Sequence, residues 1–200
     1  MQHVAAVVLA AGASRRFGSD KLLYPVRLDG KTLPLLACSL LPWLQVFTEV
    51  TVVVREESAE LRQQTEAALG AENTAALRWC VCLDAARGMS ASLACGIAQE
   101  RNAAGWLVGL ADIPHVPEAV IAAVRDAIAA GAPAAAPFCD GQRGHPVGFA
   151  ARYREELLAL QGDAGARALL QRDAALLHRI DTTERGIFAD IDSPQDLAGL

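Results

Sequence analysis

The sequence predicts a single α/β domain, a Rossmann-like three-layer sandwich built around a mainly parallel sheet. Short apolar runs alternate with helical patterns along the chain, which is the order expected of parallel strands joined by crossover helices. The length of 200 residues fits one ordinary domain. The composition, 52% hydrophobic and 20% charged, is typical of a globular chain. We therefore expect residues 1–200 to form one domain without an internal linker or repeat.

The first half of the chain supplies three expected strands and two helices. "HVAAVVLA" is apolar throughout, as a strand covered on both faces should be. The uncharged region Thr32–Trp43 is expected to be a buried helix with Pro34 near its first turn. The next expected elements, in order, are a strand in "EVTVVVR", a helix in "ESAELRQQTEAALG" that ends at Gly70, and a strand in "LRWCVCL".

The second half begins regularly and becomes less regular toward its end. "SASLACGIAQERN" is expected to be a helix, "GWLVGLAD" a fourth strand, and "PEAVIAAVRDAIAAG" a helix that starts at Pro117 and stops at Gly131. Then come "APAAAPF", "HPVGFAA", two short helices around Glu155 and Ala168, "LLHRIDT" and the tail "DIDSPQDL". Repeated strand–helix–strand units of this length predict helices on both faces of the sheet.

Charge and cysteine usage exclude several classes of protein. A net charge of -5 argues against a general nucleic-acid binder, which needs a basic face. No positive charge precedes the apolar N-terminus, and the uncharged stretch 32–48 is short for a membrane span and contains two prolines. We expect a cytoplasmic protein without a nucleic-acid or membrane partner. The five cysteines, with Cys80 and Cys82 on one face of a strand, are expected to be buried thiols.

Ligands of an open parallel sheet gather at the carboxyl ends of its strands, and the pronounced motifs fall there. "LAAGASRRFGSDK" follows the first strand. Its Gly12 and small neighbours would let backbone N–H groups approach phosphates, while Arg15, Arg16 and Lys21 supply positive charge. The loop contains neither GxGxxG nor GxxxxGK[ST], so it is not a dinucleotide fingerprint or a Walker A loop. The alternative is a solvated basic turn.

Two acidic positions could hold a divalent metal. Asp112 ends the fourth strand in "LADIP", and Asp192 lies in the tail, where it could reach the same metal if the tail folds back over the sheet edge. Magnesium prefers one or two carboxylates, with water and substrate phosphates completing its octahedron. The alternatives are a turn cap at Asp112 and a helix cap at Asp192 ahead of Pro194.

Three further motifs could contact a substrate. Ser90 and Ser92 in "GMSASLACG" lie at a helix start, where hydroxyl and N–H groups suit a base, ribose or phosphate, or simply cap the helix. "GQRGHPVGF" contains Gly144 and His145 in a tight turn, where a lone histidine is more often structural. "GDAGARALL" sets Asp163 and Arg167 near a helix start as a possible second-substrate contact or a capped helix.

Together these motifs resemble a known family. "LAAGASRRFGSDK" closely resembles the LAAGxSxRFGxxK signature of nucleotidyltransferases in the molybdenum cofactor group. "GMSASLACGI", "LADIPHV", "GQRGHPVGF", "GDAGARALL" and "DIDSPQDL" are similar to the further motifs of that group, in the same order. The resemblance spans essentially the whole chain and is to the molybdenum cofactor cytidylyltransferases, within the molybdopterin nucleotidyltransferase family.

The resemblance implies a nucleotidyltransferase (GT-A-like) fold and a Mg²⁺-dependent transfer of CMP from CTP to the phosphate of molybdopterin. Pyrophosphate would be released, and the molybdopterin cytosine dinucleotide would serve a molybdenum hydroxylase. Lys21 with Arg15 or Arg16 would hold the triphosphate, so Lys21, Arg16 and Asp112 are the expected catalytic residues. Asp112 and Asp192 are the expected metal ligands. Guanylyl-transferring relatives usually read LAGG, so Ala11 favours cytidine.

The last expectations concern the residues that would contact the nucleotide and the pterin. The expected nucleotide-binding residues are Leu9, Ala10, Ala11, Gly12, Arg15, Lys21, Ser90 and Ser92, and the expected pterin contacts are Gly144, His145, Asp163 and Arg167. Rival functions stay open at this point: guanylyl transfer, transfer to another phosphorylated acceptor such as a sugar or polyol phosphate, or a molybdenum cofactor carrier that transfers nothing.

Overall fold

The strand β1 (Val4–Leu9) lies near the middle of one large twisted sheet in a computed structural model that describes residues 3–12, 20–28, 30–191 and 195–196. The eight strands of this sheet run in the order β10-β7-β9-β6-β1-β4-β5, and β8 pairs with β7. Besides β1, the strands are β4 (Val50–Val54), β5 (Leu77–Val81), β6 (Gly105–Leu110), β7 (Ala134–Cys139), β8 (Gln142–Arg143), β9 (Val147–Ala150) and β10 (Leu177–Asp181).

The sheet is parallel from β6 through β1 and β4 to β5, and β10 also runs parallel to β7. Strand β9 is antiparallel to both of its neighbours, β6 and β7. The carboxyl ends of β1, β4, β5 and β6 therefore lie along one edge, which is where parallel sheets bind ligands. The predicted α/β fold with a mainly parallel sheet is confirmed.

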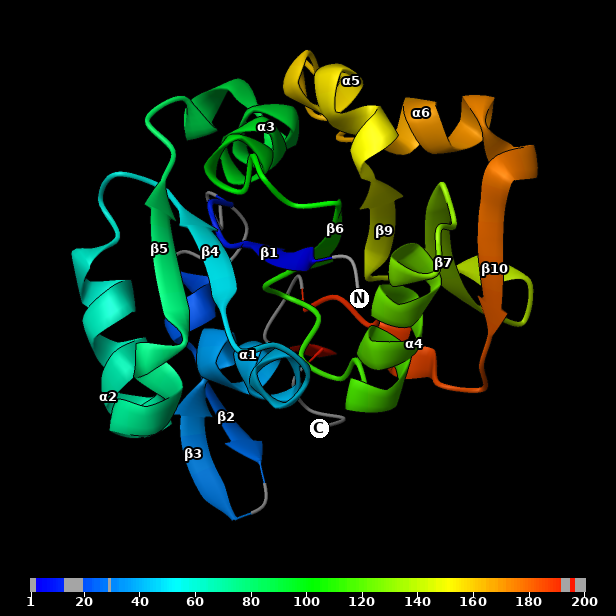
Figure 1. Cartoon of the computed structure of the whole chain (residues 1–200). Coiled ribbons are helices and arrows are strands. Elements are labelled where there is room, and N and C mark those ends of the chain that lie inside the picture. The colour runs from blue at the N-terminus through cyan, green and yellow to red at the C-terminus, as the bar shows by residue number, and fades with distance from the viewer. Residues whose placement is uncertain (1–2, 13–19, 29, 192–194, 197–200) are drawn as a thin grey trace.

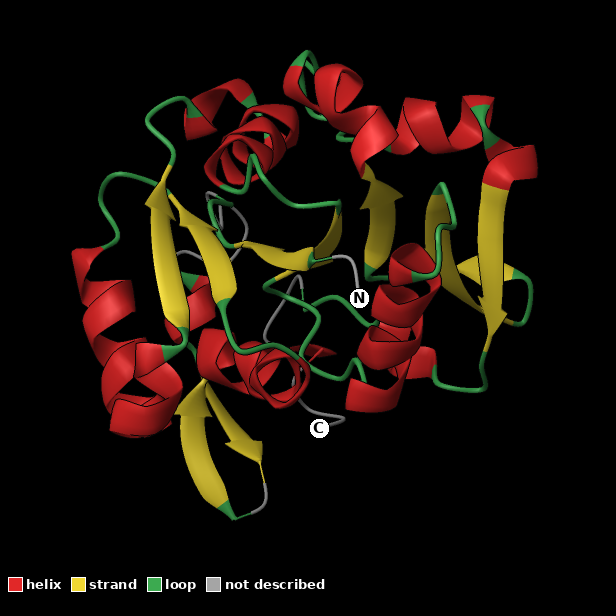
Figure 2. Cartoon of the chain, in the orientation of Figure 1, coloured by secondary structure: helices red, strands yellow, loops and turns green. Residues whose placement is uncertain are grey.

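Helices cover both faces of the sheet, which makes three layers (Figure 1, Figure 2). One face carries α1 (Leu35–Val46), α2 (Ala59–Ala75) and α4 (Glu118–Ala129), and the other carries α3 (Met89–Gln99), α5 (Arg154–Leu158) and α6 (Arg167–Arg172). Alternate β1 residues supply the two cores. Val4 and Val8 pack beneath α1 and α4, while Val7 packs beneath α3. This two-sided burial explains why β1 is apolar throughout.

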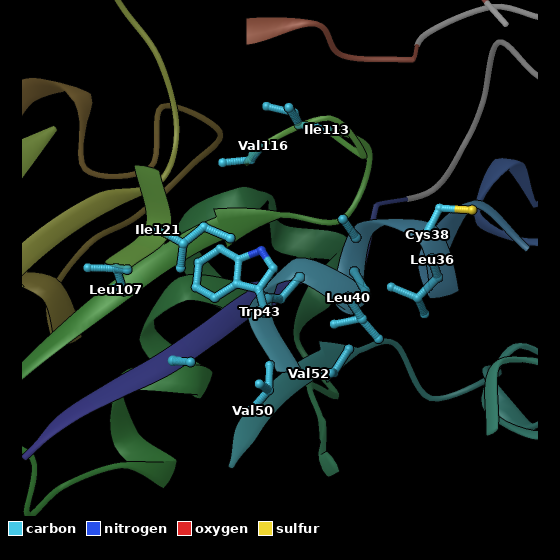
Figure 3. Close-up of a cluster of buried hydrophobic side chains, with 14 of the residues drawn as sticks. Leu36, Cys38, Leu40, Trp43, Val50, Val52, Leu107, Ile113, Val116 and Ile121 are labelled. Carbon is cyan, nitrogen blue, oxygen red and sulfur yellow. The ribbon is translucent and has the colours of Figure 1, made fainter. Parts of the chain in front are cut away.

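The aromatic centre of the first core is Trp43 of α1 (Figure 3). Its indole lies beside Leu107 of β6 and Ile121 of α4, and it is 2% exposed. A Cβ at Gly109 of β6 would lie 2.2 Å from the Trp43 ring, so this strand position must remain without a side chain. The contact fixes α1 against the end of β6, directly before the loop that carries Asp112.

Two sequence expectations were wrong in their boundaries. Residues 32–34 are not helical: they belong to β3 (Lys31–Pro34), which pairs with β2 (Pro25–Leu28) in a hairpin outside the large sheet. Proline disfavours helical geometry in the residue before it, so α1 starts only after Pro34, and it continues past Pro42 to Val46. In α2 the chain leaves helical geometry at Gly70, as predicted, but resumes it as far as Ala75.

All five cysteines are free thiols, as expected, and four of them are buried, Cys80 and Cys82 included. Cys95 differs from the expectation because it is only partly buried. Cys80 Sγ lies 3.3 Å from Cys95 Sγ. Within the described residues, no helix has the length and hydrophobicity needed to cross a membrane.

Candidate active site

A cavity of about 640 Å³ opens at the carboxyl ends of β1, β4, β5 and β6. This volume is within the range of typical small-molecule sites. Its walls include Leu9, Ala10, Ala11 and Gly12 at the end of β1, as well as Lys21, Asp112, Ser92 and Asp163. Motifs that lie more than a hundred residues apart in the sequence are thus brought to one cleft, which we call the first cavity.

Lys21 and Asp112 form the central ion pair of this cavity. Lys21 Nζ donates to Asp112 Oδ2 at 2.8 Å, and the two side chains are 13% and 25% exposed. Lys21 opens the short 3-10 helix 21–23, whose first turn is capped by the carboxylate of Asp20. Asp112 follows β6 in the loop that α1 and the core hold in place. A cation and a carboxylate therefore share one surface that is open to a ligand.

The tail folds back over the sheet edge as the sequence reasoning required. Lys21 Nζ also donates to the carbonyl oxygen of Ile191 at 2.9 Å, and the Ile191 N–H donates to the Asp112 carbonyl oxygen at 2.9 Å. Asp192 is the next residue, but it lies outside the described residues, as do Arg15 and Arg16. Their expected roles as metal ligand and triphosphate contacts stay predictions.

Arg55 is a site residue that the sequence reasoning missed. It follows β4, and its guanidinium donates to the Gly12 carbonyl oxygen at 3.1 Å and to Asp20 Oδ2 at 2.7 Å. These two acceptors flank segment 13–19, so Arg55 joins the two ends of the predicted phosphate loop. The available signal was the arginine that closes "EVTVVVR" at the carboxyl end of a strand.

Gly12 itself lies where it was predicted, but for a different physical reason. Its φ is not in the left-handed region, and a Cβ there would meet no atom of the described residues within 4 Å. Neither strain nor packing against the described part of the chain therefore requires glycine. The open space faces the first cavity, so the absent side chain leaves room for a ligand.

The two serines of α3 differ in position. Ser90 is fully buried, its N–H donates to the Gly162 carbonyl oxygen at 3.1 Å, and its hydroxyl donates to the Gln161 carbonyl oxygen at 3.1 Å. These bonds use the N–H and the hydroxyl of Ser90 to fasten the segment 161–163 to the start of α3, and the expected nucleotide contact of Ser90 stays a prediction. Ser92 lines the first cavity, and its nucleotide contact stays a prediction.

The residues expected to contact a pterin divide between two cavities. Asp163 lines the first cavity, where it packs against Gly88. His145 and Arg167 line a second cavity of about 200 Å³. Gly144 lines neither cavity. It is buried against Ile187, where a Cβ would come within 2.4 Å of the isoleucine side chain, and its expected pterin contact stays a prediction.

The second cavity adjoins the first, because Leu9, Met89 and Leu110 line both. Burial, together with the charge of Arg143, lowers the pKa of His145 to about 4, against the opposing influence of Asp112. His145 is therefore a neutral imidazole at pH 7. Burial and the neighbouring Arg167 also lower the pKa of Arg143. The second cavity is therefore positively charged, because the guanidiniums of Arg143 and Arg167 both line it.

The donor set at Asp112 fits a magnesium ion that is shared with phosphates. Among the described residues, no three His, Cys, Asp or Glu side chains converge to hold a metal by themselves. Asp112 instead offers one partly exposed carboxylate to the first cavity. Magnesium is typically bound by one or two carboxylates while phosphate oxygens and water complete its shell. The residues present therefore suit a metal that arrives with a triphosphate.

A mainly parallel α/β sheet that carries Lys21, a strand-end aspartate and two adjoining cavities at its carboxyl edge is the arrangement expected of an α/β domain that binds a small-molecule ligand. Residues 6–179 match the model of the MobA-like NTP transferase domain, and the chain belongs to this family. It is therefore a member of a nucleotidyltransferase family.

Individual relatives agree with this assignment. The chain is 31% identical to the purine catabolism protein PucB of Bacillus subtilis over 97% of its own length and 94% of the relative's. The crystal structure of Rv0371c from Mycobacterium tuberculosis is similar with a TM-score of 0.80 and 25% identity, covering 99% of this chain and 96% of that one. A structure of Rv0371c in complex with manganese matches with a TM-score of 0.75 and 23% identity, covering 99% and 97% of the two chains.

Proposed function

We propose that this protein is a cytoplasmic CTP:molybdopterin cytidylyltransferase, which transfers CMP from CTP to the phosphate of molybdopterin. The observation that carries the proposal is the Lys21–Asp112 pair at 2.8 Å, placed in a cavity that adjoins a second, arginine-lined cavity. One cavity can hold the nucleotide and the other the acceptor. The product, molybdopterin cytosine dinucleotide, would then be delivered to a molybdenum hydroxylase.

The relatives support this choice of acceptor. PucB is a protein of purine catabolism, and oxidation of purine carbon atoms is a reaction that molybdenum hydroxylases perform. The motifs "GQRGHPVGF" and "GDAGARALL" resemble those of the molybdenum cofactor group, and the structure brings residues of both motifs to the second cavity. The manganese complex of Rv0371c supports use of a divalent metal.

The nucleotide would lie in the first cavity with its phosphates near Lys21 and the loop that Arg55 anchors. Asp112 would hold the Mg²⁺, with Asp192 as the proposed second ligand. When bound, the metal neutralises triphosphate oxygens. Lys21 places a positive charge beside the same oxygens, and Arg16 would add another. Catalysis then consists of positioning the reactants and stabilising the charge that develops on the phosphates.

The transfer needs no proton donor or acceptor from the protein. An oxygen of the acceptor phosphate, already anionic at neutral pH, forms a bond to the α-phosphorus in line with the departing group. The bond from the α-phosphorus to the oxygen that bridges to the β-phosphorus breaks, and pyrophosphate leaves with the electron pair. Its charge is neutralised by the cations of the first cavity.

The preference for cytidine rests on Ala11, by resemblance to the "LAAG" of cytidylyl-transferring relatives. Ala11 is only 9% exposed and lines the first cavity, so its methyl group occupies part of the wall. Glycine at this position would enlarge the cavity by that methyl group, consistent with room for a larger purine.

The decisive experiment offers the purified protein Mg²⁺, molybdenum-loaded molybdopterin and one α-labelled nucleoside triphosphate at a time. We expect label in the pterin and released pyrophosphate with CTP only. Label from GTP would keep the chemistry but refute the interpretation of Ala11. Bound pterin with no label from any nucleotide would indicate a carrier, and absence of pterin binding would point to another phosphorylated acceptor.

A further inference from the structure

Two arginines line the second cavity without a carboxylate to neutralise them. Arg143 ends β8 and is half-buried, and Arg167 opens α6 and is exposed. Among the side chains that the structure describes, no carboxylate pairs with either guanidinium, and the cavity is lined by no Asp or Glu. A half-buried cation beside a like charge is unfavourable unless an anion binds there. The arrangement is therefore complementary to an anionic ligand.

The other residues that line the second cavity indicate the chemistry of the rest of that ligand. Leu93, Val147, Phe149 and Leu170 give it a predominantly apolar lining. A volume of about 200 Å³ accepts a compact group, such as a phosphate with part of a planar ring system. The cavity thus suits a molecule with one anionic group and a small apolar or planar body.

The proposed transfer requires positive charges beside the attacking phosphate. In the proposed function, Lys21 and the metal are committed to the triphosphate in the first cavity. An attacking phosphate is repelled by that triphosphate, so it needs positive charges of its own to approach. The shared wall of Leu9, Met89 and Leu110 makes the two cavities direct neighbours. A phosphate at their boundary would be next to the nucleotide.

We propose that Arg143 and Arg167 form a clamp that binds the acceptor's phosphate, with a planar part of the acceptor against Phe149 and Leu170. The inference rests on the proposed function for the identity of the reaction, and it defines the acceptor class as compact phosphomonoesters. The clamped phosphate supplies the oxygen that bonds to the α-phosphorus as pyrophosphate leaves. The guanidiniums move no proton: they lower the repulsion between the reactants and orient the attacking oxygen.

The clamp is tested first without any nucleotide, by calorimetric titration of the whole protein with phenyl phosphate, a phosphomonoester with a small planar body. We expect Arg143→Met to weaken its affinity by about tenfold to a hundredfold, as loss of a charged hydrogen bond does. The affinity of Arg143→Lys for phenyl phosphate should lie between those of the wild type and Arg143→Met, because lysine keeps the charge but loses the two-point contact. Lys21→Met should bind it like the wild type. Arg101→Met, an exposed arginine beyond the far end of α3, is the matched control.

Transfer kinetics with CTP and molybdopterin give the second measurement. Arg143→Met should raise the KM for the acceptor by a similar factor and leave the KM for CTP unchanged. An unchanged acceptor KM in an active enzyme, or phenyl phosphate affinity that depends on Lys21 and not on Arg143, overturns the clamp while the proposed function stands. Binding of phenyl phosphate that requires Arg143, in a protein that transfers no nucleotide, upholds the clamp and refutes the proposed function.

Discussion

Lys21 and Asp112 are 91 positions apart in the sequence, yet their Nζ and Oδ2 atoms are 2.8 Å apart. The pair spans the gap between the loop after β1 and the loop after β6, two neighbouring parallel strands. Because Asp112 is also the proposed metal ligand, the lysine holds the carboxylate in the position that the metal would share. The following predictions begin from this pair.

Replacing Lys21 should reduce catalysis strongly with little effect on folding. We expect Lys21→Met to lower kcat by about a hundredfold or more, by analogy with the loss of other preorganised electrostatic contacts. Lys21→Arg should recover part of this loss because it keeps the charge. Pyrophosphate release at saturating CTP measures the effect, with Lys31→Met in the exposed β2–β3 hairpin as the control. A full rate in Lys21→Met would remove Lys21 from the mechanism.

Asp112→Asn should change the metal requirement. The variant keeps the shape of the side chain but loses the negative charge that a divalent cation prefers. We expect the Mg²⁺ concentration for half-maximal activity to rise at least about tenfold, and Mn²⁺ binding in the presence of CTP, followed by electron paramagnetic resonance, to weaken in parallel. Asp126→Asn, at an exposed ion pair on α4, is the matched control. Identical metal titrations for Asp112→Asn and the wild type would refute the assignment.

Arg55→Met should weaken nucleotide binding indirectly. The guanidinium joins Gly12 to Asp20, so its loss frees both ends of the predicted phosphate loop. We expect the KM for CTP to rise several-fold with a smaller change in the acceptor KM. Arg78→Met removes an exposed ion pair with Glu49 far from both cavities and should change neither constant. Equal nucleotide KM values for Arg55→Met and Arg78→Met would contradict the anchoring role.

Gly88→Ala should destabilise the floor of the first cavity. Gly88 has a φ of 110°, and its Cβ would lie 2.2 Å from Asp163 Oδ1 and 2.7 Å from the Gly162 carbonyl oxygen. We expect a loss of about 1–3 kcal/mol in the free energy of unfolding, measured in urea. Gly131→Ala separates backbone strain from steric overlap, because Gly131 has a φ of 103° but, among the described residues, no atom within 4 Å of the added carbon. A smaller loss in Gly88→Ala than in Gly131→Ala would show that the overlap is relieved at no cost.

His145 should make stability fall as the pH is lowered toward 4. Its pKa drops from an ordinary value of 6.5 to about 4 in the folded protein, chiefly through burial. Between these values the unfolded chain binds a proton that the native state does not, so stability rises with pH across this window and levels off above it. His145→Gln should flatten this part of the profile in urea unfolding. An identical pH profile in the variant would exclude His145 as the source.

The sequence predicted the mainly parallel sheet, and the edge at which Lys21 and Asp112 lie, because both follow from local patterns. Apolar runs identified β1, β4, β5 and β6, and the rule that ligands gather at the carboxyl ends of parallel strands placed Lys21 and Asp112 at one edge. The β2–β3 hairpin was missed because residues 32–34 are as uncharged as the helix that follows. Two signals were available: the dipeptide Asp29–Gly30, which is typical of a two-residue hairpin turn, and Pro34, which disfavours helix in the residue before it.

Other features depend on contacts between segments far apart in the sequence. Nothing local puts Arg55 beside Gly12, since this follows from the pairing of β4 with β1. Asp163 reaches the first cavity because Ser90 fastens the segment 161–163 to α3, a contact across 71 positions. Such positions are set by tertiary packing, and a pattern in one stretch of sequence does not encode them.

The hydrogen bonds of Ile191 to Asp112 and Lys21 also bear on how the protein is made. Synthesis proceeds from the N-terminus, and chain segments can begin to fold as they emerge. When Asp112 emerges from the ribosome it can already meet Lys21, but Ile191, whose backbone braces the pair, emerges about eighty residues later, a delay of several seconds at ordinary elongation rates. The nascent chain therefore carries an unbraced pair until Ile191 emerges. The site is completed only after the cores on both faces of the sheet have begun to form.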